Sequence, residues 1–242
     1  MKALIITGGG RGIGRATALE AARRGWAVML SYVSDPAAAD AVVAGIREAG
    51  GAAEAHRADI AIETDQIALF DAAEARFGRI DAVVANAGAL APGAAPLAEM
   101  DLARLRRSLD TNLLGTMITA REAARRLPDN GALVIVSSMA ARIGSPGEYI
   151  DYAVAKGGVD TLVIGLAKEL GPRGIRVNGV RPGIIETDIH ASGGDPDRPG
   201  RFAHTASLRR TGQPEEVADA ILWLLDSASY VTGTFIDVSG GR

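Results

Sequence analysis

Short apolar runs alternate along the chain with longer segments in which apolar residues recur at three- and four-residue steps. Most of the runs are continuously apolar, which is typical of strands that are buried on both faces of a parallel sheet. The strand-like runs occupy residues 2–7, 27–32, 52–58, 81–86, 131–138, 175–182 and 233–238. Helical patterns occupy residues 12–24, 36–49, 63–76, 99–127, 150–170 and 214–226.

The order of these segments predicts an α/β fold. Strand–helix alternation favours a mostly parallel sheet with helices on both faces, and right-handed crossovers make such a sheet doubly wound. No linker, repeat or low-complexity segment interrupts the pattern, so we expect one domain over residues 1–242. Residues 187–213 are irregular and mix glycine, proline and charge, which is typical of a substrate lid or of a mobile loop.

Composition excludes several classes of protein. The chain has no cysteine, which excludes disulfides and thiol catalysis and fits a cytoplasmic location. The net charge of −3 gives no support to nucleic-acid binding. The first apolar run is too short to span a membrane, so no membrane association is expected. His56, His190 and His204 are scattered, which predicts surface or loop positions and no metal site, with substrate contact left open for the last two. Trp223 is expected in the core or at an interface.

The first strand runs into the sequence TGGGRGIG, residues 7–14, and a helical pattern begins at once. A strand that passes through glycines into a helix N-terminus is typical of a phosphate site, because the backbone N–H groups and the helix dipole attract an anion. The spacing differs from GxGxxG, and no Gly-Lys-Ser/Thr of a P-loop follows. We predict dinucleotide binding here, against the alternative of a simple tight turn.

The end of the second strand predicts which dinucleotide is bound. A carboxylate at that place binds a ribose 2′-hydroxyl and repels a 2′-phosphate. The run ends with Tyr32 and Ser34 and has no acid before Asp35, while Arg11 adds positive charge from the glycine turn. These features favour NADP(H). NAD(H) remains the alternative if the strand extends far enough to bring Asp35 to the ribose.

Six further motifs follow the glycine turn in order. They are ADI at 58–60, NAG at 86–88, TNLLG at 111–115, VSSMA at 136–140, YAVAK at 152–156 and RPGIIET at 181–187. Each motif is weak alone, but the set with the glycine turn is specific. It resembles the classical short-chain dehydrogenase/reductase family over essentially the whole chain.

The resemblance implies a seven-stranded Rossmann sheet, matching the seven strand-like runs, and nicotinamide-dependent interconversion of an alcohol and a carbonyl in a small molecule. It also implies a homotetramer, assembled through the helices at 99–127 and 150–170. The catalytic residues that it implies are Asn112, Ser138, Tyr152 and Lys156. The cofactor-binding residues that it implies, with those of the glycine turn and the second strand, are Gly8, Gly10, Arg11, Gly12, Ile13, Gly14, Tyr32, Ser34, Asp59, Ile60, Asn86, Ala87, Gly88, Tyr152, Lys156, Pro182, Gly183, Ile185 and Thr187.

Two tyrosines lie close together in the sequence YIDYAVAK, and a lysine distinguishes them. Lys156 follows Tyr152 by four residues and shares its helix face. A neighbouring ammonium favours the phenolate, so we expect a lowered pKa for Tyr152. Tyr149 has Ala153 at the same offset, which predicts a pocket wall or an interface residue. Asp151 is expected to cap the helix N-terminus.

The serine and asparagine roles also come from the resemblance. Ser138 would bind the substrate oxygen together with Tyr152, and Asn112 would hold a water that relays protons to the lysine. Family members commonly have the serine one residue nearer to the tyrosine, where this chain has Met139. An extra loop residue explains the shift. We choose Ser138 because it ends the strand run and because Ser137 should point to the opposite face.

Several alternative functions remain open. A 3-oxoacyl-thioester reductase would need a basic surface for its carrier protein, for which the candidates are Arg142, Arg198, Arg201, Arg209 and Arg210. A sugar or polyol dehydrogenase that uses NAD(H) is equally consistent with the motifs. A non-catalytic nucleotide-binding regulator is disfavoured, because such proteins usually lack the tyrosine or the lysine. Extended epimerases and dehydratases share that pair but have a different glycine spacing.

Overall fold

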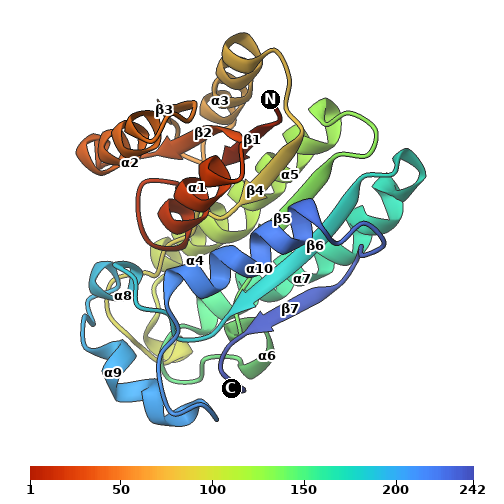
Figure 1. The fold of residues 1–242 in the computed structure, drawn as a ribbon. Helices are drawn as coiled ribbons and strands as arrows, with labels where there is room; N and C mark the ends of the chain where they lie inside the picture. The colour runs from red at the N-terminus through yellow and green to blue at the C-terminus, as the bar shows by residue number, and fades with distance from the viewer.

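The computed structural model describes residues 1–242 and contains one sheet between two layers of helices (Figure 1). The seven strands lie in the order β3-β2-β1-β4-β5-β6-β7, and all neighbouring strands are parallel. The predicted doubly wound Rossmann fold is confirmed, with a sheet that is wholly parallel. The strands are β1(Ala3–Ile6), β2(Ala27–Tyr32), β3(Ala53–Arg57), β4(Ala82–Ala85), β5(Ala132–Val136), β6(Arg176–Pro182) and β7(Phe235–Val238).

Each face of the sheet is covered by its own apolar core. Successive strand side chains point to opposite faces, so Leu4 and Ile6 pack in one core and Ile5 packs in the other. Helices α1, α2 and α10 supply the first core, and α3, α5 and α7 supply the second. Burial on both faces explains why the strands are continuously apolar in the sequence.

The longer helices begin and end close to the predicted residues, with one exception. None of them is long and apolar enough to cross a membrane. The longer helices are α1(Gly12–Arg23), α2(Pro36–Glu48), α3(Glu63–Phe77), α4(Leu102–Leu109), α5(Gly115–Arg126), α7(Ile150–Leu170) and α10(Pro214–Asp226). The short helices are α6(Ala140–Ile143), α8(Ile189–Ser192) and α9(Arg198–Phe202).

The exception is the segment 99–127, which was expected to be one helix. It consists of α4 and α5, joined by a π-helical turn over Asp110–Leu114. A π-helical turn carries one extra residue and is frequent at functional sites. No apolar periodicity marks such an insertion, because the helix axis continues through it. The turn contains Asn112, one of the predicted site residues.

The irregular segment 187–213 has more local structure than the sequence indicated. It contains α8, α9 and a short 3₁₀ turn over Ala203–Thr205. A parallel bridge between Ile185 and Gly212 joins the two ends of the segment. The segment therefore leaves the sheet after β6 and returns to nearly the same place before α10.

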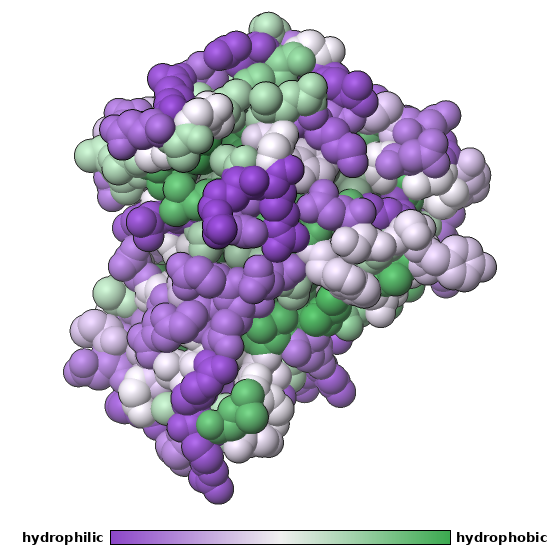
Figure 2. Space-filling model, in the orientation of Figure 1, coloured by the Kyte–Doolittle hydropathy of each residue, from purple (hydrophilic) through white to green (hydrophobic).

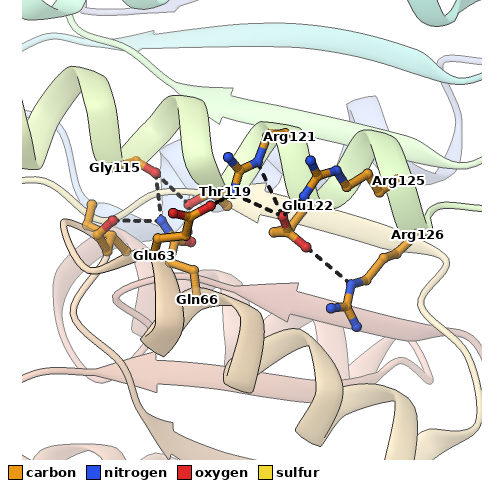
Figure 3. Close-up of polar contacts among 9 residues, drawn as sticks. Glu63, Gln66, Gly115, Thr119, Arg121, Glu122, Arg125 and Arg126 are labelled. Carbon is orange, nitrogen blue, oxygen red and sulfur yellow. Dashed lines mark hydrogen bonds and ion pairs between the residues drawn. The ribbon is translucent and has the colours of Figure 1, made fainter.

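A buried polar cluster connects α3 to α5 beside the π-helical turn (Figure 3). Gln66 of α3 donates from Nε2 to the carbonyls of Ile60, at 2.7 Å, and Gly115, at 2.8 Å. Its Oε1 accepts from the Thr119 hydroxyl at 2.7 Å. One buried side chain thus holds the loop after β3 to the beginning of α5.

One prediction about a single residue is wrong, and for a second residue only the interface alternative remains. Asp151 does not cap α7, because the helix begins two residues earlier than such a cap would require, with Tyr149 at the N-cap. Asp151 is instead buried and accepts from Arg104 Nε of α4 at 3.1 Å. Trp223 lies on α10 but is 45% exposed, so it does not belong to the core. An apolar helix stripe does not show which of its members lies at the rim.

Candidate active site

A cleft of about 590 Å³ opens at the carboxyl ends of the strands. The sheet order reverses between β1 and β4, and ligands of doubly wound sheets bind at such a switch point. The predicted site residues come from eight separate segments, and all of them line the cleft except Gly14 and Asn112. These two lie directly behind its wall, as their contacts show.

The glycine turn is shaped to leave backbone N–H groups free at the beginning of α1. Gly8 and Gly12 have φ values of +66° and +50°, which L-residues with side chains rarely adopt. A Cβ on Gly14 would clash with the Gly8 carbonyl oxygen, so only glycine fits there. No side chain caps the first N–H groups of α1. The turn therefore fits the pyrophosphate of a dinucleotide, which backbone N–H groups and the helix dipole would bind.

Neighbouring strands hold this turn in place. Asn86, after β4, donates from Nδ2 to the carbonyls of Thr7 at 2.9 Å and Gly8 at 3.1 Å. Thr7 Oγ1 accepts from the backbone N–H groups of Asn86 and Ala87. A Cβ on Gly12 would meet the Thr187 side chain at 3.0 Å, which brings the beginning of the 187–213 segment against the turn.

The far end of the cleft contains the residues that follow β2. The strand ends at Tyr32, and the Asp35 side chain accepts from the Ala38 N–H at 3.0 Å as the cap of α2. The NAD(H) alternative required a strand long enough to bring Asp35 to the ribose. Strand β2 is not that long. Arg11 is exposed on the cleft wall and forms no ion pair. Asp59 lines the same end, and its Oδ1 accepts from the Ala61 N–H at 2.9 Å.

At the other end of the cleft, the side chains of Tyr152 and Ser138 lie next to each other. Burial raises the pKa of Tyr152 to about 12, against the lowering effects of Ser138 and the positive charge of Arg198. The predicted lowering by Lys156 is wrong for this structure. Burial disfavours the phenolate more than Ser138 and Arg198 favour it, and Lys156 is not among the causes of this pKa shift.

The Lys156 ammonium lies behind the tyrosine ring, with Nζ 5.5 Å from the ring centroid. It is buried and donates to the Val136 carbonyl at 2.8 Å. Burial lowers the pKa of Lys156 to about 8, partly offset by the carboxylate of Asp160. Its proton is therefore easily exchanged near neutral pH, as a proton relay requires.

Asn112 is fully buried and spans the space between the π-helical turn and the loop after β4. Its Nδ2 donates to the carbonyls of Ala89 at 2.9 Å and Ser108 at 3.0 Å, and its Oδ1 accepts from the Ala89 N–H at 2.9 Å. A Cβ on Gly88 would lie 2.9 Å from Asn112 Oδ1 and 3.6 Å from Lys156 Nζ. The asparagine amide and the lysine ammonium thus both lie on the side of Gly88 where a Cβ would stand.

The two serines at the end of β5 make different contacts, as strand alternation predicts. Ser137 is buried, and its hydroxyl donates to Asp160 Oδ1 at 2.6 Å on α7. Ser138 is partly exposed and lies next to Tyr152. Its Oγ also accepts from the Ala140 N–H at 3.1 Å.

Comparison with known proteins now decides the family. A family model described as Enoyl-(Acyl carrier protein) reductase matches residues 8–242. The chain is 47% identical to the uncharacterized oxidoreductase YgfF of Escherichia coli over the full length of both proteins. It is 39% identical to cis-4-hydroxycyclohexanecarboxylate dehydrogenase of Sinomonas cyclohexanicum, covering 98% of this chain and 94% of that one. The chain belongs to the short-chain dehydrogenase/reductase family.

A solved structure supports the same assignment. A short chain dehydrogenase from Burkholderia cenocepacia, in complex with NADP, has a TM-score of 0.92 and 31% identity over 99% of this chain and 97% of that one. This short-chain dehydrogenase/reductase is therefore an oxidoreductase that acts on an alcohol/carbonyl pair with NAD(P) as cofactor. The alternative of a non-catalytic regulator is set aside.

Four residues of this dehydrogenase/reductase line the cleft near Tyr152 without having been assigned to the site. They are Tyr149, His190, Arg198 and Arg242. Tyr149 was expected at a pocket wall or an interface, and it forms part of the wall. Its hydroxyl donates to the Gly193 carbonyl at 3.2 Å.

His190 is buried rather than on the surface, with Nε2 2.9 Å from the Ile185 carbonyl. Arg198 was considered only as part of an outer basic surface, yet it is buried in the cleft wall. Arg242 is the last residue of the sequence and belongs to no motif. The only sequence signal for His190 and Arg198 was their place in the irregular 187–213 segment.

Proposed function

We propose that the protein is an NADP(H)-dependent oxidoreductase that interconverts a secondary alcohol and a carbonyl, with Tyr152 as the general acid and base. The observation that carries this proposal is the placement of Tyr152, Ser138 and Lys156 together on one cleft that continues to the glycine turn. Lys156 supplies a buried ammonium behind the tyrosine. This is the constellation that proton transfer to a carbonyl oxygen needs.

In the direction of reduction, NADPH supplies a hydride to the carbonyl carbon when it is bound. The carbonyl electron pair moves onto oxygen, and Tyr152 donates its Oη proton to that oxygen. Ser138 hydrogen-bonds the same oxygen and stabilises its developing charge. The remaining phenolate is stabilised by the Lys156 ammonium and takes its next proton from solvent. Oxidation of the alcohol follows the same steps in reverse.

Asn112 acts in this proposal by holding backbone in place. Its side chain fixes Ala89 through two hydrogen bonds, and the adjacent Gly88 lies against Lys156 Nζ. A larger residue at position 88 would displace either the amide or the ammonium. The role of holding a relay water stays a prediction.

The preference for NADP(H) rests on the charges at the glycine turn. Asp35 is engaged at the N-terminus of α2, and no other acid lies between the end of β2 and that helix. Arg11 is exposed on the wall and free of any carboxylate partner, so it is available to a 2′-phosphate. The bound NADP of the Burkholderia cenocepacia protein agrees with this preference.

The structure gives little support to an acyl-carrier-protein reductase. Four of the five arginines expected to form a basic surface are paired with carboxylates, and the fifth, Arg209, donates to the His204 carbonyl. The ion pairs are Arg142–Asp237, Arg198–Glu148, Arg201–Asp195 and Arg210–Glu216. Pairing leaves little net positive charge for an acidic carrier protein. A small free substrate, such as the hydroxy acid of the Sinomonas cyclohexanicum relative, fits better.

We also propose that the enzyme assembles as a homotetramer. The helix layer of α4, the π-helical turn, α5 and α7 exposes large apolar side chains to water, which marks an interaction surface. They are Leu102, Leu109, Leu114, Met117, Val154 and Ile164. The face that carries α1 and α10 is mainly hydrophilic, with separate smaller apolar patches (Figure 2).

A cofactor and substrate panel tests the proposal. Ketones, oxo acids, sugars and acyl thioesters are incubated with NADPH or NADH, and the loss of reduced-nicotinamide absorbance is followed. We expect turnover of free ketones or oxo acids and a kcat/KM at least about tenfold higher with NADPH, because a charge-assisted phosphate contact contributes about 1.5–3 kcal/mol. Preference for NADH, or turnover of acyl thioesters alone, would contradict the proposal.

A further inference from the structure

Arg198 has an unused donor in the wall of the cleft. The residue is 8% exposed, and its Nη2 donates to Glu148 Oε2 at 2.7 Å. Its Nε is buried and has no hydrogen-bond partner. Only four buried side-chain atoms in the whole chain lack a partner, and two of them, Arg198 Nε and His190 Nδ1, belong to residues that line the cleft. Buried donors are almost always paired, so this one indicates a missing ligand.

A second guanidinium lies beside the first. Arg198 and Arg242 approach the same ring, with their Cζ atoms 5.1 and 5.3 Å from the centroid of Phe202. Arg242 also lines the cleft and forms no ion pair with a side chain. The ring of Tyr149 supports Arg198 from another side, with its centroid 5.4 Å from Cζ. The aromatic rings thus hold both cations at one wall.

The acidic side chains nearby do not balance this pair. Glu148 is the one carboxylate that pairs with Arg198. Asp195 pairs with Arg201 on the outside of the segment. Asp188 lines the cleft but is exposed to solvent. Arg198 thus has one carboxylate partner and Arg242 has no side-chain partner, so a bound anion would stabilise the two guanidiniums.

This cation pair lies at the substrate end of the cleft. Arg198, Tyr149 and Tyr152 all line the cleft, and the positive charge of Arg198 acts on Tyr152. The pyrophosphate of the dinucleotide would bind at the glycine turn, and the side-chain hydrogen bond and ion pair of Arg198 go to Glu148 instead. An anion held by Arg198 would accordingly belong to the substrate and not to the dinucleotide.

We propose that Arg198 and Arg242 bind a carboxylate of the substrate, so that the enzyme acts on a hydroxy acid and its oxo acid. This inference rests on the proposed function and specifies its substrate class. Arg198 gives Nη2 to Glu148, which leaves its Nε to donate to one oxygen of a bound anion, with Arg242 as the second guanidinium. The carboxylate end is anchored there, while the carbonyl oxygen lies between Ser138 and Tyr152.

The test compares two ketones that differ only in charge, 4-oxocyclohexanecarboxylate and 4-oxocyclohexanecarboxamide. We expect the native enzyme to prefer the acid by about tenfold to a hundredfold in kcat/KM, the range of one or two charge-assisted hydrogen bonds. Arg198→Met is combined with Glu148→Gln, because removing the arginine alone would leave a buried charge unpaired. Both this double variant and Arg242→Gln should reduce the ratio of kcat/KM for the acid to kcat/KM for the amide. In the double variant the ratio should fall to about one. Arg201→Gln is the control, since Arg201 is exposed and does not line the cleft, and its preference should stay native.

A binding measurement separates this inference from the proposed function. The NADP⁺-loaded enzyme is titrated with cyclohexanecarboxylate and with cyclohexanecarboxamide by calorimetry. Tighter binding of the carboxylate, lost in the double variant, supports the anion site even if neither ketone is reduced. Equal binding of both, or a preference that survives in the double variant, would overturn it. Failure of all carbonyl turnover, with the carboxylate still bound, would count against the proposed function alone.

Discussion

Tyr152 and Lys156 have pKa values shifted in opposite directions by the same cause, burial. The phenol is kept protonated, with its pKa raised to about 12, and the ammonium is made labile, with its pKa lowered to about 8. A protonated phenol suits carbonyl reduction, whereas alcohol oxidation needs the phenolate. The two directions should therefore depend on pH differently.

We predict that kcat/KM for alcohol oxidation rises between about pH 6 and pH 9, by up to tenfold per unit, because the phenolate fraction grows by that factor below its pKa. The positive charge of the oxidised cofactor lowers the apparent pKa of Tyr152, but the rate of oxidation still rises with pH. Carbonyl reduction should change little up to about pH 8, since the phenol stays protonated. Initial rates in both directions across this range provide the measurement. An oxidation profile that is flat throughout would exclude a tyrosine base with a raised pKa.

The two serines of β5 offer a matched pair. Ser138→Ala removes the hydroxyl next to Tyr152 and should lower kcat by about 10²-fold, the effect of losing one oxyanion donor. Ser137→Ala breaks the hydrogen bond to Asp160 and should cost about 1 kcal/mol of folding stability with turnover largely retained. Steady-state kinetics and urea unfolding of both variants give the comparison. Equal losses of kcat would show that the serine was misassigned.

Local chemistry explains which site residues were predictable. The spacing of Tyr152 and Lys156 is read within one helical turn, and Ser138 follows from strand alternation. Arg198 and Arg242 were not recognised, because a segment outside the sheet and the end of the chain carry them to the cleft. Such placement depends on long-range packing that no local pattern records.

Among the elements, the contact between α3 and α5 supports the cofactor end of the cleft (Figure 3). Gln66 satisfies the buried carbonyls of Ile60 and Gly115, and Ile60 lines the cleft. Gln66→Leu should lower the free energy of unfolding by about 1–3 kcal/mol, because buried acceptors lose their donor, and should raise the KM for NADPH. Thr119→Val removes one hydroxyl from the same cluster and should have a smaller effect. Chemical denaturation and cofactor titration of both variants test this, and an unchanged Gln66→Leu enzyme would contradict it.

Most elements were predictable because apolar residues recur regularly along the helices and form continuous runs in the strands. The strands and five of the six predicted helices lie within about two residues of their expected bounds. The break between α4 and α5 was missed, since a π-helical turn shifts the helix phase without interrupting its apolar pattern. Helices α8 and α9 are too short for a period to be visible.

At the scale of the molecule, alternating strands and helices were enough to predict the sheet and the edge where the site lies. We propose that residues 1–242 fold as one domain around that sheet. Its assembly depends on the apolar layer of α4, α5 and α7, whose exposure only the folded structure reveals.

Met117→Glu tests that assembly. Met117 is 45% exposed on α5, and a carboxylate there would be buried without a partner in an interface. We expect size-exclusion chromatography with light scattering to show a tetramer for the native chain and a smaller species for the variant. Ile62→Glu, at a comparably exposed apolar position before α3, is the control and should leave the native mass. A native monomer, or a variant of native mass, would contradict the proposed interface.

The central claim is that the hydroxyl of Tyr152 exchanges the proton that accompanies hydride transfer. Tyr152→Phe and Tyr149→Phe remove the same atom three residues apart, one from the proposed acid and one from a bond to the Gly193 carbonyl. We predict that Tyr152→Phe loses at least about 10²–10⁴-fold in kcat while it binds NADPH as tightly as the native enzyme. Tyr149→Phe should retain most of its turnover. Turnover at the native rate by Tyr152→Phe, followed as NADPH absorbance, would contradict the account.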